Sequence, residues 1–389
     1  MRIQTWVCLL LVLGCSSLIV LQVMLSWAPP TVSPGPYSSH ASRNKSVLIH
    51  GNAVFAFVPD SQDLYREAAE FLYPSWAFAT QQPLDPLPST KIVKTPPRLD
   101  LILIVQRETL PKLNLKLCQR LSLSVLIPSN DTDVEEKIGE DLVSQIPFSS
   151  NQSHCFLIPH ALYTDDFWIQ NEYQFMHSIS FLAAPRYKLL LSSYDMILKT
   201  DLDVFLTPAL PYFKSSSPFS YGLGFYVARP VTKAKLVRIS SILGLRHQNV
   251  HNIGATWFGD GMLISKVAAI SLEVAQHMIL NEFGPNVSKS WPEWWRGVIS
   301  LYASELAVNH VLSKDEIQNV ASHFDVFSHS VSNTASVCHI HCWHQLNVFS
   351  KRLWKENKYS KDLFPQDNLA INVIRDYCLY IALYYSELV

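Results

Sequence analysis

The sequence has no excess of charge of either sign. Its 389 residues include 31 lysines and arginines and 32 aspartates and glutamates, which gives a formal net charge of −1. Binding of nucleic acid depends on a basic surface that neutralises phosphates, so this balance gives no electrostatic basis for a nucleic-acid partner. The sequence also has no internal repeat, and a repeat architecture is therefore not expected.

Residues 6–28 lack charge almost entirely and are about long enough to span a bilayer. Arg2 precedes this segment, and no basic residue follows it until Arg43. The positive-inside rule then places residues 1–5 in the cytosol and the rest of the chain in a lumen. A cleaved signal peptide is the alternative, but the uncharged run is long for one and residues 26–28 form a poor cleavage site. We expect an uncleaved transmembrane signal anchor and a single-pass type II topology.

Residues 29–46 are rich in proline, serine and glycine, which favours an extended stem over a packed core. Residues 47–389 are expected to form one luminal domain. Asparagine glycosylation sequons, which suit a lumen, lie at Asn44, Asn130, Asn151 and Asn286.

Five of the seven cysteines follow the apolar segment, at positions 118, 155, 338, 342 and 378. Disulfides persist in a lumen. Because five is an odd number, at least one of these cysteines is free or forms an intermolecular disulfide, which leaves a disulfide-linked oligomer open. The pairing cannot be deduced from the sequence.

Short apolar runs alternate with helical patterns along the domain. Runs at 53–58, 99–105 and 121–127 indicate buried strands. Helical spacing follows Ser61 and recurs at 172–184. This alternation predicts an α/β fold with a mainly parallel sheet and helices on both faces. Ligands of such sheets bind at the carboxyl ends of the strands.

Two carboxylates, Asp201 and Asp203, follow the apolar run 196–198. Side chains two residues apart on a strand point the same way, and like charges are costly to bury without a partner. A hard divalent cation, Mn²⁺ or Mg²⁺, would remove that cost. The alternative is a helix cap or turn after the strand. A second Asp-x-Asp, at 131/133, lies in a polar loop and is interpreted as a solvated turn.

Glycines surround Trp257 and Asp260 in the segment 251–264, whose last residues return to strand character before a helix capped by Ser265. The tryptophans of 291–295 could stack on a sugar or belong to the core.

The pattern of 296–312 predicts a helix that carries Tyr302, Glu305 and Asn309 on one side, facing either an acceptor or solvent. An amphipathic helix is expected at 367–385.

The segment 338–344, CHIHCWH, carries three imidazoles, and His339, His341 or His344 could complete a metal site on the two aspartates. A zinc knuckle is one alternative, although a second Cys/His pair at ordinary spacing is missing. Core or surface histidines without a ligand role are the other. The basic residues downstream could neutralise a diphosphate: Lys351, Arg352, Lys355 and Lys358.

The order of these parts resembles the GT-A (nucleotide-diphosphosugar transferase) glycosyltransferases of the Golgi. Its layout is most similar to glycosyltransferase family 8, the glycogenin/galactinol synthase type. The matching pieces are FAFVPDSQDLYREAAEFLYPSW, MILKTDLDVFLTPALPYF, GATWFGDGMLIS, SELAVNHVL and HCWHQLNVFSKRLW, which span roughly residues 50–360. Of these, the Asp-x-Asp piece is specific at the level of single residues.

The resemblance implies a GT-A (Rossmann-like) fold and a set of site residues. Asp201 and Asp203 would bind Mn²⁺ (or Mg²⁺), and His344 or His341 would complete the metal shell. Asp260 and Glu305 would face the acceptor and the donor sugar as catalytic groups. Contacts with the nucleotide and its diphosphate are expected from Val58, Arg186, Asp201 and Lys351.

The sequence therefore predicts a Golgi (or ER) membrane enzyme that transfers a sugar from a nucleotide-diphosphate donor to a glycan or glycoprotein, and the resemblance implies that the donor is UDP-linked. Retention and inversion at the anomeric carbon stay open. One alternative is a transferase-like protein that has lost catalysis and binds glycans or a partner. A hydrolase with paired carboxylates is less suited, because its acids would flank a cleft from separate elements.

Overall fold

An eight-stranded sheet forms the centre of the domain in the computed structural model, in the order β3-β4-β2-β1-β5-β8-β7-β9. Of these described strands, only β8 runs antiparallel to its neighbours. The predicted mainly parallel α/β sheet is thereby confirmed. The strands are β1 Ile49–Val58, β2 Leu99–Gln106, β3 Cys118–Arg120, β4 Cys155–His160, β5 Tyr194–Lys199, β7 Phe219–Leu223, β8 Ile253–Gly259 and β9 Ile317–Asn319.

The structure describes residues 49–81, 96–123, 129, 131–162, 166–283, 292–342 and 349–389. The predicted cytosolic tail, membrane anchor and stem lie outside these residues. So do His344 and three of the sequons, Asn44, Asn130 and Asn286. Ser46–Val389 forms one compact unit.

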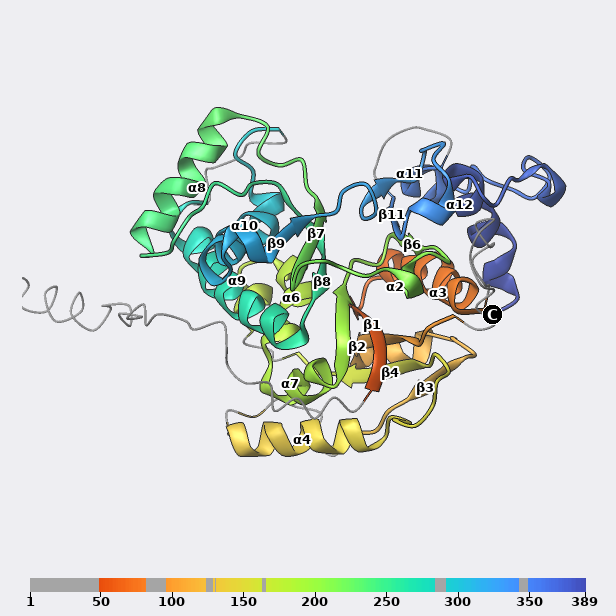
Figure 1. The fold of residues 1–389 in the computed structure, drawn as a ribbon, viewed down its shortest axis with the longest axis horizontal. Coiled ribbons are helices and arrows are strands. Elements are labelled where there is room, and N and C mark those ends of the chain that lie inside the picture. Colours follow the sequence, from red (N-terminus) through yellow and green to blue (C-terminus); the bar gives the residue numbers. More distant parts are fainter. Residues whose placement is uncertain are drawn as a thin grey trace, which may run out of the picture. The chain divides into compact units, whose positions relative to one another are not determined.

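Both faces of the sheet are buried, because alternate side chains of each central strand enter different cores. In β1, Phe55 and Phe57 belong to one core, and Val54 and Val58 belong to the other. The first core is covered by α4 Thr132–Ser144, α6 His177–Ala183, α7 Pro185–Ser192, α8 Pro230–Ile242, α9 Gly261–Asn281 and α10 Ile299–Val311 (Figure 1). The second is covered by α2 Gln62–Glu67, α3 Tyr73–Gln81 and α12 Ile374–Leu383.

A small second sheet lies over the second core. It consists of β10 Val326–Phe327, β11 His339–His341 and β6 Val204–Leu206. The ring of Phe205 in β6 lies 5.0 Å from that of Phe71 and 5.3 Å from that of Phe349, between ring centroids. Figure 1 shows β6 and β11 near α2 and near α11, Lys351–Lys355. This sheet joins the middle of the chain to its C-terminal part.

Some predicted elements differ from the structure. The predicted strand at 262–264 is the first turn of α9, since Asp260 caps this helix by accepting bonds from the amides of Met262 and Leu263, at 3.0 and 3.1 Å. Pro185 starts α7 rather than merely ending the preceding helix, because proline fits a first helical position.

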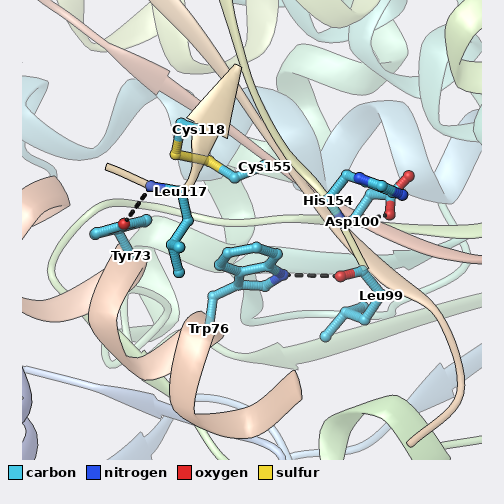
Figure 2. The surroundings of a disulfide bond; sticks show 8 residues. All are labelled: Tyr73, Trp76, Leu99, Asp100, Leu117, Cys118, His154 and Cys155. Carbon is cyan, nitrogen blue, oxygen red and sulfur yellow. Dashed lines mark hydrogen bonds between the residues drawn. A yellow bond between two sulfur atoms is a disulfide. The ribbon is translucent and has the colours of Figure 1, made fainter. Parts of the chain in front are cut away.

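The strand predicted at 121–127 is also absent from the part of this segment that the structure describes. Residues 121–123 belong to no strand, and 124–128 lie outside the described residues. The edge of the sheet is instead formed by β3 and β4. A disulfide between their register partners Cys118 and Cys155 joins these two strands (Figure 2). Cys338, Cys342 and Cys378 are free and buried.

Helix α9 is the one described helix that is long and apolar enough to cross a membrane. Half of its most apolar stretch is buried within the domain. Residues such as Val267, Ala275 and Met278 pack into the first core. These contacts are those of a core helix.

Candidate metal centre

Asp201 and Asp203 lie in the bend between β5 and β6, at the carboxyl end of β5. The chain passes from β1 to β2 on one side of the sheet, and β5 adds to β1 on the other side. The strand order therefore reverses next to β5, and crevices at such reversal points are where open α/β sheets bind ligands. The apolar run that ends at the two aspartates places them at this position.

His341 reaches the aspartates through the small sheet. It is the register partner of Val204 in the antiparallel pair β11–β6, and the amide of Cys342 donates to the carbonyl of Asp203 at 2.9 Å. The Nε2 atom of His341 lies 3.3 Å from Oδ1 of Asp203. One ligand atom each from Asp201, Asp203 and His341 lies within 4.8 Å of the other two. Two carboxylates and an imidazole are a donor set that suits Mn²⁺.

Asp325 is a buried carboxylate that the sequence analysis missed. Its Oδ1 lies 3.2 Å from Nδ1 of His341 and accepts a bond from the Thr256 hydroxyl at 2.6 Å. A carboxylate behind the remote nitrogen of a ligating imidazole fixes the ring's tautomer and orientation. Asp325 thus directs Nε2 of His341 at Asp203.

Two glycines make room for this carboxylate. A Cβ added at Gly222 or Gly254 would come within 1.8 or 2.7 Å of Oδ2 of Asp325. The glycines of the 251–264 segment were the only sequence signal of a close approach here. They did not identify Asp325 as the group that approaches.

The three histidines of the 338–344 segment differ in position. His341 faces the aspartates, whereas His339 is fully buried and its Nε2 lies 2.7 Å from the Thr200 hydroxyl. Burial lowers the pKa of His339 to about 4, which keeps this ring neutral. Its contact with Thr200 joins β11 to the residue that follows β5. His344 lies outside the described residues.

Each aspartate of the pair also contacts a lysine. Nζ of Lys199 lies 3.2 Å from Asp201 Oδ1, and Nζ of Lys351 lies 2.5 Å from Asp203 Oδ2. Burial by itself would raise the pKa of Asp203, but His341 and Lys351 outweigh burial and hold this pKa well below its ordinary value. The carboxylate is therefore charged and available as a ligand at neutral pH.

Glu67, at the end of α2, is a second acid that the sequence analysis missed. It is buried, and Lys355 Nζ lies 2.9 Å from its Oε1. Burial and the charge of Asp203 raise the pKa of Glu67 to about 7. The sequence did contain a signal for Glu67. It lies three residues after Leu64 and four before Phe71, so helical spacing predicts a charged side chain on the apolar face of the helix.

Asp260 and Arg186 do not join the cluster. Because β8 is antiparallel to β5, Trp257 pairs with Lys199 and Gly259 pairs with Ile197. Asp260 therefore lies towards the amino end of β5, away from the two aspartates, and caps α9. The buried guanidinium of Arg186 lies 2.6 Å from Glu135, joining α7 to α4.

Glu305 faces neither the cluster nor solvent. It is fully buried in α10, where Oε2 accepts bonds from the Tyr226 hydroxyl and the Asn252 amide, each at 2.8 Å. Burial by itself would raise its pKa, but His247, His251 and Tyr226 outweigh burial and hold the pKa below its ordinary value. Asn309, on the same helix, binds the backbone of the loop that precedes β8.

Two further residues singled out in the sequence, Val58 and Trp294, are buried. Val58 is fully buried at the carboxyl end of β1, where it pairs with Val105 of β2. Trp294 stacks on Phe283 and Tyr302 in the core, which favours the core interpretation of this residue over sugar contact.

The chain belongs to the family described as "Domain of unknown function (DUF7164)", whose model matches residues 46–380. This range contains Asp201, Asp203, Asp325, His341 and Lys351. None of the curated proteins matches the sequence. The family description names no activity, so inference of function begins from the group formed by Asp201, Asp203 and His341.

Proposed function

We propose that this member of the family is a metal-dependent glycosyltransferase with a GT-A fold, similar in layout to glycosyltransferase family 8. The observation that carries the proposal is the meeting of Asp201, Asp203 and His341 at the carboxyl end of β5. The mostly parallel sheet and the strand-order reversal at this point support it. A nucleotide-diphosphate sugar, UDP-linked by the resemblance, would be the donor.

The donor set fits Mn²⁺ or Mg²⁺, held by Asp201, Asp203 and His341. When bound, the ion would act as a Lewis acid on the leaving diphosphate. Asp325 orients His341, as its contact with Nδ1 shows. Lys351, whose ammonium contacts Asp203, would bind phosphate oxygens of the donor.

The proposed location is the Golgi or ER lumen, with the chain anchored as a single-pass type II membrane protein. The Cys118–Cys155 disulfide supports an oxidising compartment, and the sequon asparagine Asn151 is exposed. A glycan or glycoprotein is the acceptor that fits this location. The apolar segment 6–28 would supply the anchor.

The second candidate is a transferase-like protein without catalysis that binds glycans or tethers a partner. The observation in its favour is that amines already compensate both aspartates. Lys199 contacts Asp201 and the carbonyl of Ala255, at 3.2 and 2.8 Å, and Lys351 contacts Asp203. A carboxylate pair balanced in this way can be stable without a cation.

The test is a panel of nucleotide sugars, screened with purified full-length protein for Mn²⁺-dependent donor hydrolysis. We expect the Asp203→Asn substitution to reduce turnover at least about 100-fold, since a catalytic metal contributes several kcal/mol. The matched control is Asp133→Asn, which alters the exposed Asp-x-Asp at the start of α4 and should leave turnover unchanged. Equal turnover of wild type and Asp203→Asn would remove the metal site from the mechanism. Binding of UDP without turnover of any donor would favour the second candidate.

A further inference from the structure

A second cluster of metal-ligating side chains lies between the loop before β8 and the helix α10. It consists of His247 and His251 from the loop and Glu305 from the helix. One ligand atom from each lies within 4.8 Å of the other two. Nδ1 of His251 is 2.6 Å from Glu305 Oε1, and Nε2 of His247 is 3.8 Å from the same oxygen.

The two imidazoles have unused nitrogens inside the protein. The side chain of His247 is 5% exposed and that of His251 is 12% exposed. The Nε2 atom of each ring is buried and has no hydrogen-bond partner among the described residues. A buried polar atom without a partner costs free energy, and an ion bound between Nε2 of His247 and Glu305 would remove that cost at His247.

We propose that His247, His251 and Glu305 form a second metal site, selective for Zn²⁺, that fastens the loop 247–252 to α10. Two imidazoles and one carboxylate match the ligands that zinc takes, and they leave a coordination position for water. The Asp201/Asp203/His341 cluster offers mostly oxygen and suits harder ions, so the two clusters favour different metals. This zinc-site proposal does not depend on whether the chain is a glycosyltransferase.

The surrounding hydrogen bonds are compatible with an ion. Glu305 Oε2 is occupied by Tyr226 and Asn252, so Oε1 is the oxygen that would bind zinc. An ion held by Oε1 and by Nδ1 of His251 would take the place of the proton that these two atoms share. At His247, Nδ1 now accepts from the amide of Asn249 at 3.1 Å. Ligation through Nε2 gives up this bond, and the exposed Asn249 amide can then reach water.

The strand β8 connects the His247/His251/Glu305 cluster to the surroundings of the Asp201/Asp203 cluster. His251 lies two residues before β8, whose Gly254 packs against Asp325 and whose Ala255 carbonyl accepts from Lys199. Four residues of strand span about 13 Å. An ion that fixes the loop would thus fix the start of the strand lining the Asp201/Asp203 cluster.

The experiment compares Zn²⁺ binding by full-length protein in which Asp203→Asn already weakens the first cluster. The test protein adds His247→Asn and His251→Asn, and its matched control adds His50→Asn, which alters an exposed histidine of β1. Zinc affinity is measured by competition with a chromophoric chelator, and Co²⁺ replaces zinc to give the visible absorption of imidazole coordination. Circular dichroism checks that each protein is folded.

We expect the control to bind one more equivalent of Zn²⁺ than the test protein, or to bind at least about 100-fold more tightly, since even an outer-shell change costs 10–100-fold. Zinc should also raise the melting temperature of the control and not that of the test protein. Equal zinc affinity and equal Co²⁺ spectra in the two proteins would overturn the proposal. If the double substitution prevents folding, His247→Asn alone decides between the same outcomes.

Discussion

At the scale of single residues, the candidate metal centre depends on charges that specific neighbours compensate. Asp203 is negative because His341 and Lys351 outweigh its burial, and His341 is oriented by Asp325. The ligands and the groups behind them come from separate parts of the chain. Removing a group behind a ligand should therefore change metal affinity without removing a ligand.

We predict that Asp325→Asn weakens Mn²⁺ binding by about 10- to 100-fold, because His341 loses the carboxylate that holds its ring. The amide keeps the size of the side chain and can still accept from Thr256. Isothermal titration with Mn²⁺ measures the effect, and Asp362→Asn, at an exposed carboxylate, is the control. Mn²⁺ affinity that is the same in Asp325→Asn and wild type would show that Asp325 does not position His341.

At the scale of elements, β4 carries two features that affect stability. Its first residue, Cys155, forms the disulfide with Cys118 of β3, and its last, His160, is buried with Nδ1 2.9 Å from the Tyr187 hydroxyl. Figure 2 shows that the disulfide lies near Trp76 of α3, whose indole donates to the Leu99 carbonyl at 2.8 Å. The two features can be tested separately.

His160 should make the domain less stable in mild acid. Burial, followed by the charge of Arg186, lowers its pKa from 6.5 to about 4. Unfolded chains therefore take up a proton at a higher pH than folded ones, and stability falls as the pH decreases from 6.5 to 4. The loss from this residue is about 3 kcal/mol.

In the His160→Asn variant, we expect the free energy of unfolding to depend less on pH across this window. Denaturant unfolding at pH 7 and pH 4.5 measures the difference, with His50→Asn as the exposed control. If His160→Asn and wild type lose the same stability over this interval, the buried imidazole is not the group responsible.

The disulfide should contribute to stability by closing a loop in the unfolded chain. The two cysteines are 37 residues apart, and loop-closure entropy for that length gives up to about 4 kcal/mol. We predict that replacing both cysteines with serine lowers the free energy of unfolding by about this amount. A reducing agent should have the same effect on wild type and none on the variant. Insensitivity of the wild type to reduction would contradict the prediction.

At the scale of the whole domain, the small sheet assembles the site. Lys351 and Asp203 are 148 residues apart in sequence, and the pairing of β11 with β6 places this C-terminal part beside the aspartates. The aromatic rings of Phe71, Phe205 and Phe349 pack beneath that pairing. The candidate metal centre therefore depends on the packing of the core below it.

We predict that Phe205→Ala lowers stability by about 3–5 kcal/mol, the range for removing a buried phenylalanine. It should also weaken Mn²⁺ binding, because β6 no longer holds β11 in place. Phe156→Ala is the matched control, since it removes a fully buried ring of β4 from the other core. The control should lower stability by a similar amount and leave Mn²⁺ affinity unchanged. If both folded variants bind Mn²⁺ equally, the small sheet does not control the site.

The sequence identified what is encoded locally. The apolar runs 53–58 and 196–198 predicted β1 and β5, because a strand buried on both faces needs a continuous apolar stretch. The Asp-x-Asp at 131/133 is exposed, as predicted, but it begins a helix rather than a turn: Asp131 caps α4, and Asp133 lies in its first turn. In each case, neighbours in the sequence determine the structure.

What the sequence left open depends on how distant segments pair. The direction of β8 placed Asp260 away from the aspartates, and the register of β11 on β6 selected His341 over His339. Asp325 gave no sequence signal of its own, because its role comes from contacts with residues far along the chain. Local patterns thus determined the strands and the acidic pair, whereas tertiary pairing decided which side chains meet them, since strand direction and register are properties of two segments together.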